Sequence, residues 1–243
     1  MKQLITIASA LALLLAGCKK KGCLESSGSK TISVRAVKPF SQIHLNDNIN
    51  LILKQDTVES VTLEAGSQLQ EYIQAEVTNG VLSFHNNSAC SWMKGASENI
   101  TAYVSFKGLS RLYLYGSGNV SAVNTITGSR IYIDAFQAAS SVALNLKIDV
   151  ADLIIREENA DFTIGGEITD SAYIFSGIKG TMDLRNLKVK RAEVDQRSVR
   201  NMYVWATDQL WVKVEYKGNV YYKGSPSLME YQQFNDGRLL LLQ

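Results

Sequence analysis

The sequence predicts an all-β protein, a right-handed parallel β-solenoid with coils of about 20 residues and a less regular N-terminal β portion. From residue 110 onward, apolar residues recur about every 20 residues, and such a period is typical of solenoid repeats. Within each repeat, apolar and polar residues alternate in runs rich in Val, Ile, Tyr and Thr. There is no proline between Pro39 and Pro226, so strands are favoured over helices.

The first residues are typical of a secretion signal that is removed from the mature chain. A positive start and an apolar stretch end in Leu15-Ala16-Gly17-Cys18, which resembles a bacterial lipobox. We therefore predict a signal peptide over 1–17, a lipidated Cys18 and a tether over 18–30. Acyl chains on Cys18 would anchor the protein to the membrane, and Lys19 after it predicts the outer membrane. The sequence leaves open whether the protein faces the periplasm or the cell surface.

Composition excludes several classes of function. Loss of Lys2 with the signal leaves 24 basic residues against 23 acidic ones, and a nucleic-acid-binding protein would need a basic excess. His44 and His85 are isolated, so the pattern indicates no metal site, and no cofactor is expected. Cys23 and Cys90 remain in a compartment that permits disulfides, and the sequence leaves open whether they pair.

Columns of inward-facing residues on three successive strands of each coil define the solenoid repeat over residues 109–226. The first strand of each coil begins with Leu112, Ile131, Leu153, Ala172, Ala192 and Leu210, followed two residues later by Leu114, Ile133, Ile155, Ile174, Val194 and Val212. A second strand contributes Val120, Val142, Phe162, Met182, Met202 and Val220. A third column of Ile126, Ile148 and Ile168 degrades at Lys188 in the next coil. Three strands with inward-facing apolar residues in each coil predict a triangular prism, in which each coil covers the apolar surface of the coil below.

The two ends of a solenoid need protection, because an open coil exposes unpaired strand edges. We expect residues 227–243 to form a C-terminal cap, with Leu228 to Leu242 folded over the last coil. Residues 31–108 read as strands of irregular spacing, with one short helix over Ser67 to Tyr72. The periodicity leaves open whether they start the same solenoid or form a small separate β-subdomain.

Three short motifs give the chain a resemblance to a known family. Phe40-Ser41-Gln42-Ile43 opens the pattern, Leu109-Ser110-Arg111-Leu112 with Gly116-Ser117-Gly118 follows, and Val220 to Pro226 closes it. This arrangement resembles the putative auto-transporter adhesin family with the head GIN domain. Later coils depart from it, with Phe136-Gln137-Ala138 where the family repeats Gly-Ser-Gly. The resemblance implies a β-helix-like fold and gives no catalytic residues.

Aromatic residues on the outside of the coils are the candidate binding face. Alternation places Tyr113, Tyr132, Tyr173 and Trp211 on one face, and Tyr203, Trp205 and Tyr221 on the next. We expect Tyr113, Tyr132 and Tyr173 to stack as an aromatic ladder. Such a face can bind a glycan or a protein, which would make the chain a non-enzymatic adhesin or binding module. The sequence does not indicate an oligomeric state.

Two other functions are open at this point. Parallel β-helices also carry polysaccharide lyases and hydrolases, and the richest acidic group for such chemistry is Glu157, Glu158 and Asp161 with Asp134 one coil below. An exposed turn explains these acids equally well. The remaining alternative is a structural protein of the envelope.

Overall fold

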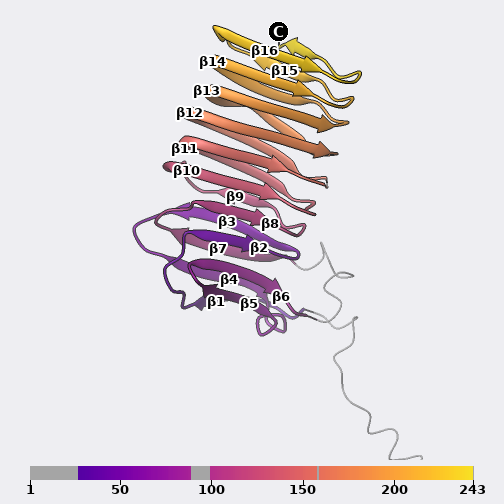
Figure 1. Cartoon of the computed structure of the whole chain (residues 1–243). Coiled ribbons are helices and arrows are strands. Elements are labelled where there is room, and N and C mark those ends of the chain that lie inside the picture. Colours follow the sequence, from indigo (N-terminus) through magenta and orange to yellow (C-terminus); the bar gives the residue numbers. More distant parts are fainter. Residues whose placement is uncertain (1–26, 89–98, 158, 243) are drawn as a thin grey trace, which may run out of the picture.

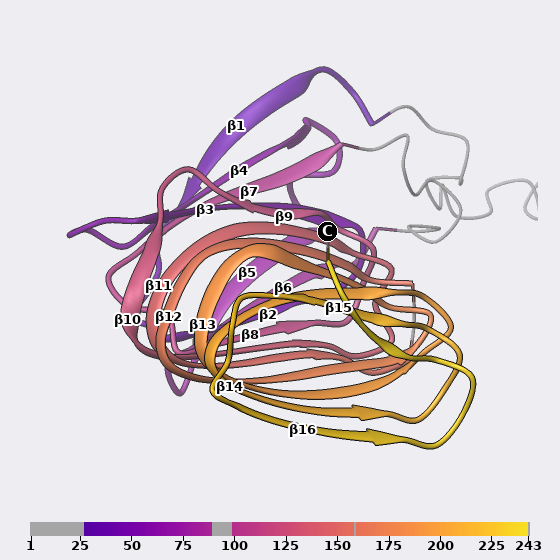
Figure 2. The ribbon, with the colours of Figure 1, turned by 90° about the horizontal axis from the view of Figure 1, so that it is seen from above.

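The computed structural model describes residues 27–88, 99–157 and 159–242. Their strands join into one 17-stranded sheet that coils into a right-handed solenoid of about 6 turns (Figures 1 and 2). The described residues contain no helix. None of them therefore forms an apolar helix of membrane-spanning length.

The upper coils consist of long parallel strands that bend at the corners of the prism. Register shifts mark two of these corners in one coil, between Thr163 and Gly165 and between Ile168 and Ser171. The strands are β8 (Arg111–Leu114), β9 (Val120–Ala122), β10 (Ile126–Ala135), β11 (Ser141–Ile155), β12 (Asp161–Ile178), β13 (Thr181–Ser198), β14 (Met202–Val214), β15 (Val220–Lys223), β16 (Leu228–Gln233) and β17 (Leu239–Leu241).

The column predicted for the second strand of each coil is confirmed. Val120, Val142, Phe162, Met182, Met202 and Val220 pair in this order, rung upon rung. Phe162 and Met182 are fully buried. Each coil thus covers the apolar surface of the coil below, which is the stabilising principle of the fold.

The pairing predicted for the other columns is wrong in places. Leu112 pairs with Ile133 rather than with Ile131, because this coil is two residues longer than the predicted spacing. The third column continues through Val189 instead of Lys188, since a bulge precedes it. A shift of two residues keeps a side chain on the same face of a strand, so the predicted residues are buried all the same.

The N-terminal portion is the start of the same solenoid, in an order that does not follow the sequence. Its strands are β1 (Lys30–Arg35), β2 (Gln42–Leu45), β3 (Ile49–Gln55), β4 (Ser60–Gly66), β5 (Ile73–Thr78), β6 (Val81–Asn86) and β7 (Ile100–Phe106). β2 lies in parallel between β6 and β8, and β3 lies between β7 and β9. Antiparallel strands β1, β4 and β5 close the lower end (Figure 1).

The short helix expected over Ser67 to Tyr72 is absent, and these residues form turns. The amides of Leu69 and Tyr72 donate to the carbonyls of Gly66 and Leu69, which are i to i+3 bonds of consecutive turns. Six residues between β4 and β5 are too few for a stable helix without further packing.

The segment expected to cap the C-terminal end forms one more rung of the sheet. β16 pairs in parallel with β14, and β17 pairs in parallel with β15. The alternation in Leu228 to Leu242 therefore extends the sheet, and side chains of β16 stay exposed at the end of the prism.

The glycines of Gly116-Ser117-Gly118 have a packing role. This turn lies on the turn of the coil below, and a Cβ atom at Gly116 or Gly118 would come within 1.8 Å or 1.7 Å of the carbonyl oxygens of Asp47 and Ile49. Only glycine allows this approach of two backbones.

Several sequence-based expectations lie outside the described residues. These are the signal peptide over 1–17, the lipidation of Cys18, most of the tether over 18–30 and the disulfide between Cys23 and Cys90.

Candidate functional site

The candidate site lies on one outer face of the solenoid, which we call the front face because Figure 1 looks onto it. Strands β2, β8 and β16 and the C-terminal parts of β10 to β14 form it. One outward column on this face runs through Tyr132, Asp152, Tyr173, Glu193, Trp211 and Glu230. Aromatic and acidic side chains therefore alternate from coil to coil.

The predicted ladder of Tyr113, Tyr132 and Tyr173 does not form. Asp152 lies between Tyr132 and Tyr173, and Tyr113 belongs to the neighbouring column, where it pairs with His44 and Asp134. The cause is the two-residue difference in coil length described above. Tyr113 still contacts Tyr132 diagonally, with ring centroids 5.5 Å apart.

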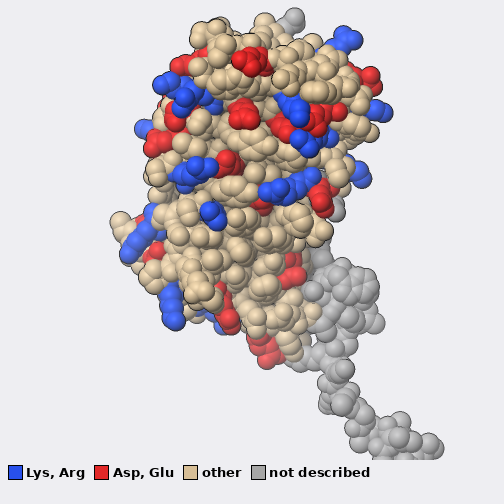
Figure 3. Space-filling model, viewed as in Figure 1, with Lys and Arg blue, Asp and Glu red and all other residues tan. Residues whose placement is uncertain are grey.

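The lower part of the front face carries an aromatic cluster. Tyr113 lies 4.9 Å from the ring of His44 and 6.2 Å from that of Tyr115, and Tyr115 lies 6.3 Å from Phe136. Burial lowers the pKa of His44 below its usual value, and the nearby His85 adds a smaller effect in the same direction. Both favour an uncharged ring in the cluster. This part of the surface is nearly free of charged groups in Figure 3.

An ion pair closes the cluster on its upper side. Arg156 donates from Nε to both carboxylate oxygens of Asp134 at 3.0 Å, and the Tyr132 hydroxyl donates to Oδ2 at 2.8 Å. The hydrogen bond with Asp134 raises the pKa of Arg156. Burial raises the pKa of Tyr132, and the hydrogen bond of its hydroxyl to Asp134 raises it further. Asp134 is buried, and Arg156 and Tyr132 both contact its carboxylate, which suits a structural role.

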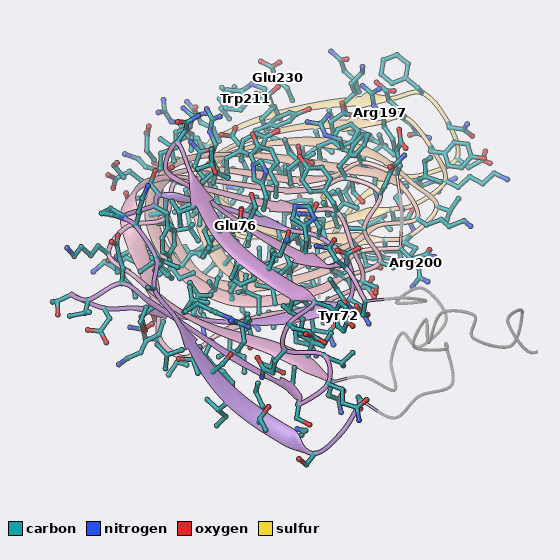
Figure 4. All side chains as sticks on the ribbon, turned by 90° about the horizontal axis from the view of Figure 1, so that it is seen from below. Tyr72, Glu76, Arg197, Arg200, Trp211 and Glu230 are labelled. Carbon is teal, nitrogen blue, oxygen red and sulfur yellow. The ribbon has the colours of Figure 1, made fainter. Side chains whose placement is uncertain are left out.

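A groove occupies the upper part of the front face. Tyr173, Glu193 and Trp211 line two adjoining depressions with volumes of about 310 and 420 Å³. Figure 4 shows Trp211 beside Glu230 on this face. Burial raises the pKa of Tyr173, and so do the carboxylates of Asp195 and Glu193. The Tyr173 hydroxyl is thus an uncharged hydrogen-bond donor beside the carboxylates of Asp195 and Glu193.

Charged side chains of both signs surround the aromatic walls. Arg130 forms an ion pair with Asp152 at 2.6 Å on one side of the groove. Arg191 lies beside them, and its Nε is buried without a hydrogen-bond partner among the described residues. Guanidinium groups, carboxylates and rings that converge on one hollow can bind a ligand with both hydroxyl groups and an apolar surface.

Sequence reasoning missed several residues of this face. Glu193 and Asp152 alternate with the predicted aromatics in the same column, and their outward parity was the available signal. No sequence signal places His44 beside Tyr113, because this depends on the out-of-order insertion of β2 under β8.

The second predicted aromatic group, Tyr203, Trp205 and Tyr221, lies on the adjacent face formed by β14 and β15. Tyr203 and Tyr221 stack with centroids 5.2 Å apart. Arg185 lies 4.2 Å above the ring of Tyr203, and Lys223 lies 4.0 Å from that of Trp205. Cations thus occupy positions over two of these three rings.

The predicted acidic group for lyase or hydrolase chemistry does not come together. Asp134 is on the front face and Asp161 begins β12 on the adjacent face, while Glu158 lies outside the described residues. Among the described residues, no three or more His, Cys, Asp or Glu side chains are grouped so as to hold a metal ion.

Several solved structures share this fold. A putative adhesin from Bacteroides fragilis is 18% identical, with a TM-score of 0.79, over 88% of this chain and 97% of that one. A putative lipid binding protein from Parabacteroides distasonis is 14% identical, with a TM-score of 0.62, over 88% and 97%. A putative adhesin from the same species is 16% identical, with a TM-score of 0.59, over 88% and 98%. At these identities the likeness shows the fold alone.

No curated protein matches the sequence. A family model does, over residues 39–226, which is most of the chain and includes the motifs at Phe40, Gly116 and Pro226. The proteins of this family and its structural neighbours are named as adhesins or lipid-binding proteins and not as enzymes, which is consistent with a cell-envelope or surface protein. The chain therefore belongs to the family described as putative auto-transporter adhesin, head GIN domain.

Proposed function

We propose that the protein is a non-enzymatic adhesin of the cell envelope that binds a glycan in the groove of its front face. The observation that carries this proposal is the pair of aromatic walls, Tyr173 and Trp211, two coils apart with Glu193 between them. Aromatic rings pack against the apolar face of a sugar, and carboxylates and guanidinium groups bind its hydroxyls.

The shape of the site favours a glycan over a protein ligand. The two depressions adjoin and share Tyr173, Glu193 and Trp211, so together they form an elongated hollow across several coils. A linear polymer fits such a hollow along its length. A protein partner would instead need a larger exposed apolar centre, and acidic and basic groups are interspersed over this part of the face (Figure 3).

Loss of the two aromatic walls tests the proposal. We expect the full chain to bind glycans on an array, and Tyr173→Ala with Trp211→Ala to weaken the best of them at least about 30-fold, as removal of one binding hot spot does. Tyr203→Ala with Tyr221→Ala is the matched control on the adjacent face, and binding should survive it. Equal binding by parent and groove variant contradicts the proposal, as does release of new sugar chain ends from the bound glycan.

The proposal includes a lipid anchor at Cys18, which holds the adhesin on the outer membrane. Its support is the lipobox-like sequence before Cys18. We expect cells fed labelled palmitate to incorporate label into the parent chain and not into Cys18→Ser. Label retained in Cys18→Ser would show that the anchor is elsewhere.

A further inference from the structure

The turns that follow the front-face strands stack on one another in the last four coils. The amide of Val199 donates to the carbonyl of Ile178, that of Gly218 to Ser198, and that of Gly237 to Tyr216. With a rung spacing of about 4.8 Å, the four turns form a convex edge roughly 14 Å long. We call this edge the basic ridge. It projects on the right of the solenoid in Figures 1 and 2.

Large apolar side chains point into solvent from every turn of the basic ridge. Their exposed fractions are 52% for Ile178, 48% for Val199, 39% for Tyr216 and 63% for Phe234. Ile178 also has a φ of 37°, a left-handed conformation that is unfavourable for a β-branched residue. Neither the exposure nor the strain stabilises the isolated protein, which points to an interaction made by these side chains.

Each turn of the basic ridge also carries a cation without an ionic partner. Lys179, Arg200, Lys217 and Arg238 are exposed, and none of them forms an ion pair with another described residue. These turns contain two acidic residues, Glu215 and Asp236, and Glu215 is paired with Arg197 and Lys213. The neighbouring Arg197 differs, because Asp195 and Glu215 neutralise it.

Buried hydrogen bonds hold the ridge in place from inside the prism. Gln196 donates from Nε2 to the carbonyl of Arg200 at 2.6 Å, and Ser198 donates to the carbonyl of Gly180 at 2.9 Å. Gln196 and Ser198 are fully buried. The ridge residues therefore keep their positions, and binding through them would require little ordering of the backbone.

We propose that the basic ridge docks on the surface of an anionic phospholipid bilayer. Cations interleaved with apolar side chains match an interface in which anionic headgroups cover an apolar layer. A bilayer is fluid and accepts a convex edge, whereas a protein partner would need a groove of matching shape. Arg200 lies at the corner, well away from Trp211 (Figure 4). Docking would thus leave the glycan groove accessible, and the inference goes beyond glycan binding.

Fluorescence quenching at the ridge tests the docking. The full chain carrying Phe234→Trp is reconstituted into vesicles of phosphatidylcholine, with or without phosphatidylglycerol, whose acyl chains are brominated. The fluorescence of the unmodified chain, which contains three native tryptophans, is measured as the background. Val123→Trp, at a position that is 68% exposed on another part of the surface, is the matched reporter. We expect quenching of Trp at position 234 in the anionic vesicles only, and none at position 123.

Removal of the cations identifies their role. A triple variant of the Phe234→Trp chain carries Lys179→Gln, Arg200→Gln and Lys217→Gln. We expect its equilibrium constant for docking on anionic vesicles to be lower on the order of 100-fold, at about fivefold per cation. Lys38→Gln with Lys147→Gln and Lys190→Gln removes the same charge elsewhere and should leave quenching intact. Equal quenching in neutral vesicles, equal loss in both triple variants, or quenching of both reporters would overturn the proposal.

Discussion

Gly118→Ala is expected to destabilise the protein by about 3 kcal/mol, at the upper end of the cost of overpacking. The added Cβ would lie 1.7 Å from the carbonyl oxygen of Ile49, and no side-chain rotation can relieve a clash with backbone. The coil of β8 and β9 would have to move away from β2 and β3, which would weaken the contact between the N-terminal portion and the repeats. Unfolding in denaturant, followed by circular dichroism, measures the change.

Gly108→Ala is the matched control for this substitution. A Cβ at Gly108 would meet no atom within 4 Å, and its backbone is outside the left-handed region. Its unfolding curve should overlie that of the parent. A similar midpoint for both alanine variants would show that the two turns do not pack on one another as described.

Phe162→Ala should have the largest effect on stability, about 3 to 5 kcal/mol. The ring is fully buried in the centre of the column between Val142 and Met182, so its loss leaves a cavity in contact with two coils. Native domains are stable by only about 5 to 15 kcal/mol, and much of the margin would disappear. The free energy of unfolding from a denaturant titration gives the value.

The neighbouring Thr163→Ala provides the comparison. Thr163 is exposed, so its truncation removes no buried surface and should change the free energy of unfolding by less than about 0.5 kcal/mol. If both substitutions had equal effects, Phe162 would not be an interior residue and the stacked core would be wrong.

Periodicity predicted which residues are buried better than it predicted which residues pair. The column through Phe162 has nearly constant spacing, and the sequence reveals it directly. The column through Leu112 was misaligned because the coil from β8 to β10 is two residues longer than the predicted spacing. Such a change keeps the parity of the strand, so burial stays correct while the neighbours across the ladder differ.

The candidate site was predicted only in part for the same reason. Alternation identified Tyr173 and Trp211 as outward residues, and the structure brings them to one groove. The aromatic cluster around Tyr113 could not be foreseen, because His44 reaches it from a strand about 70 positions earlier in the chain. Contacts of this kind follow from topology, which hydrophobic periodicity does not encode.

The insertion of β2 and β3 between later strands confines the irregular topology to the lower end, and above β9 each coil contacts only the coils next to it. Gain or loss of a whole coil there would leave both the antiparallel base and the final rung unchanged. Each such event alters the height of the molecule by about 4.8 Å. The length of the solenoid can therefore evolve in fixed increments, independently of the chemistry displayed on any one rung.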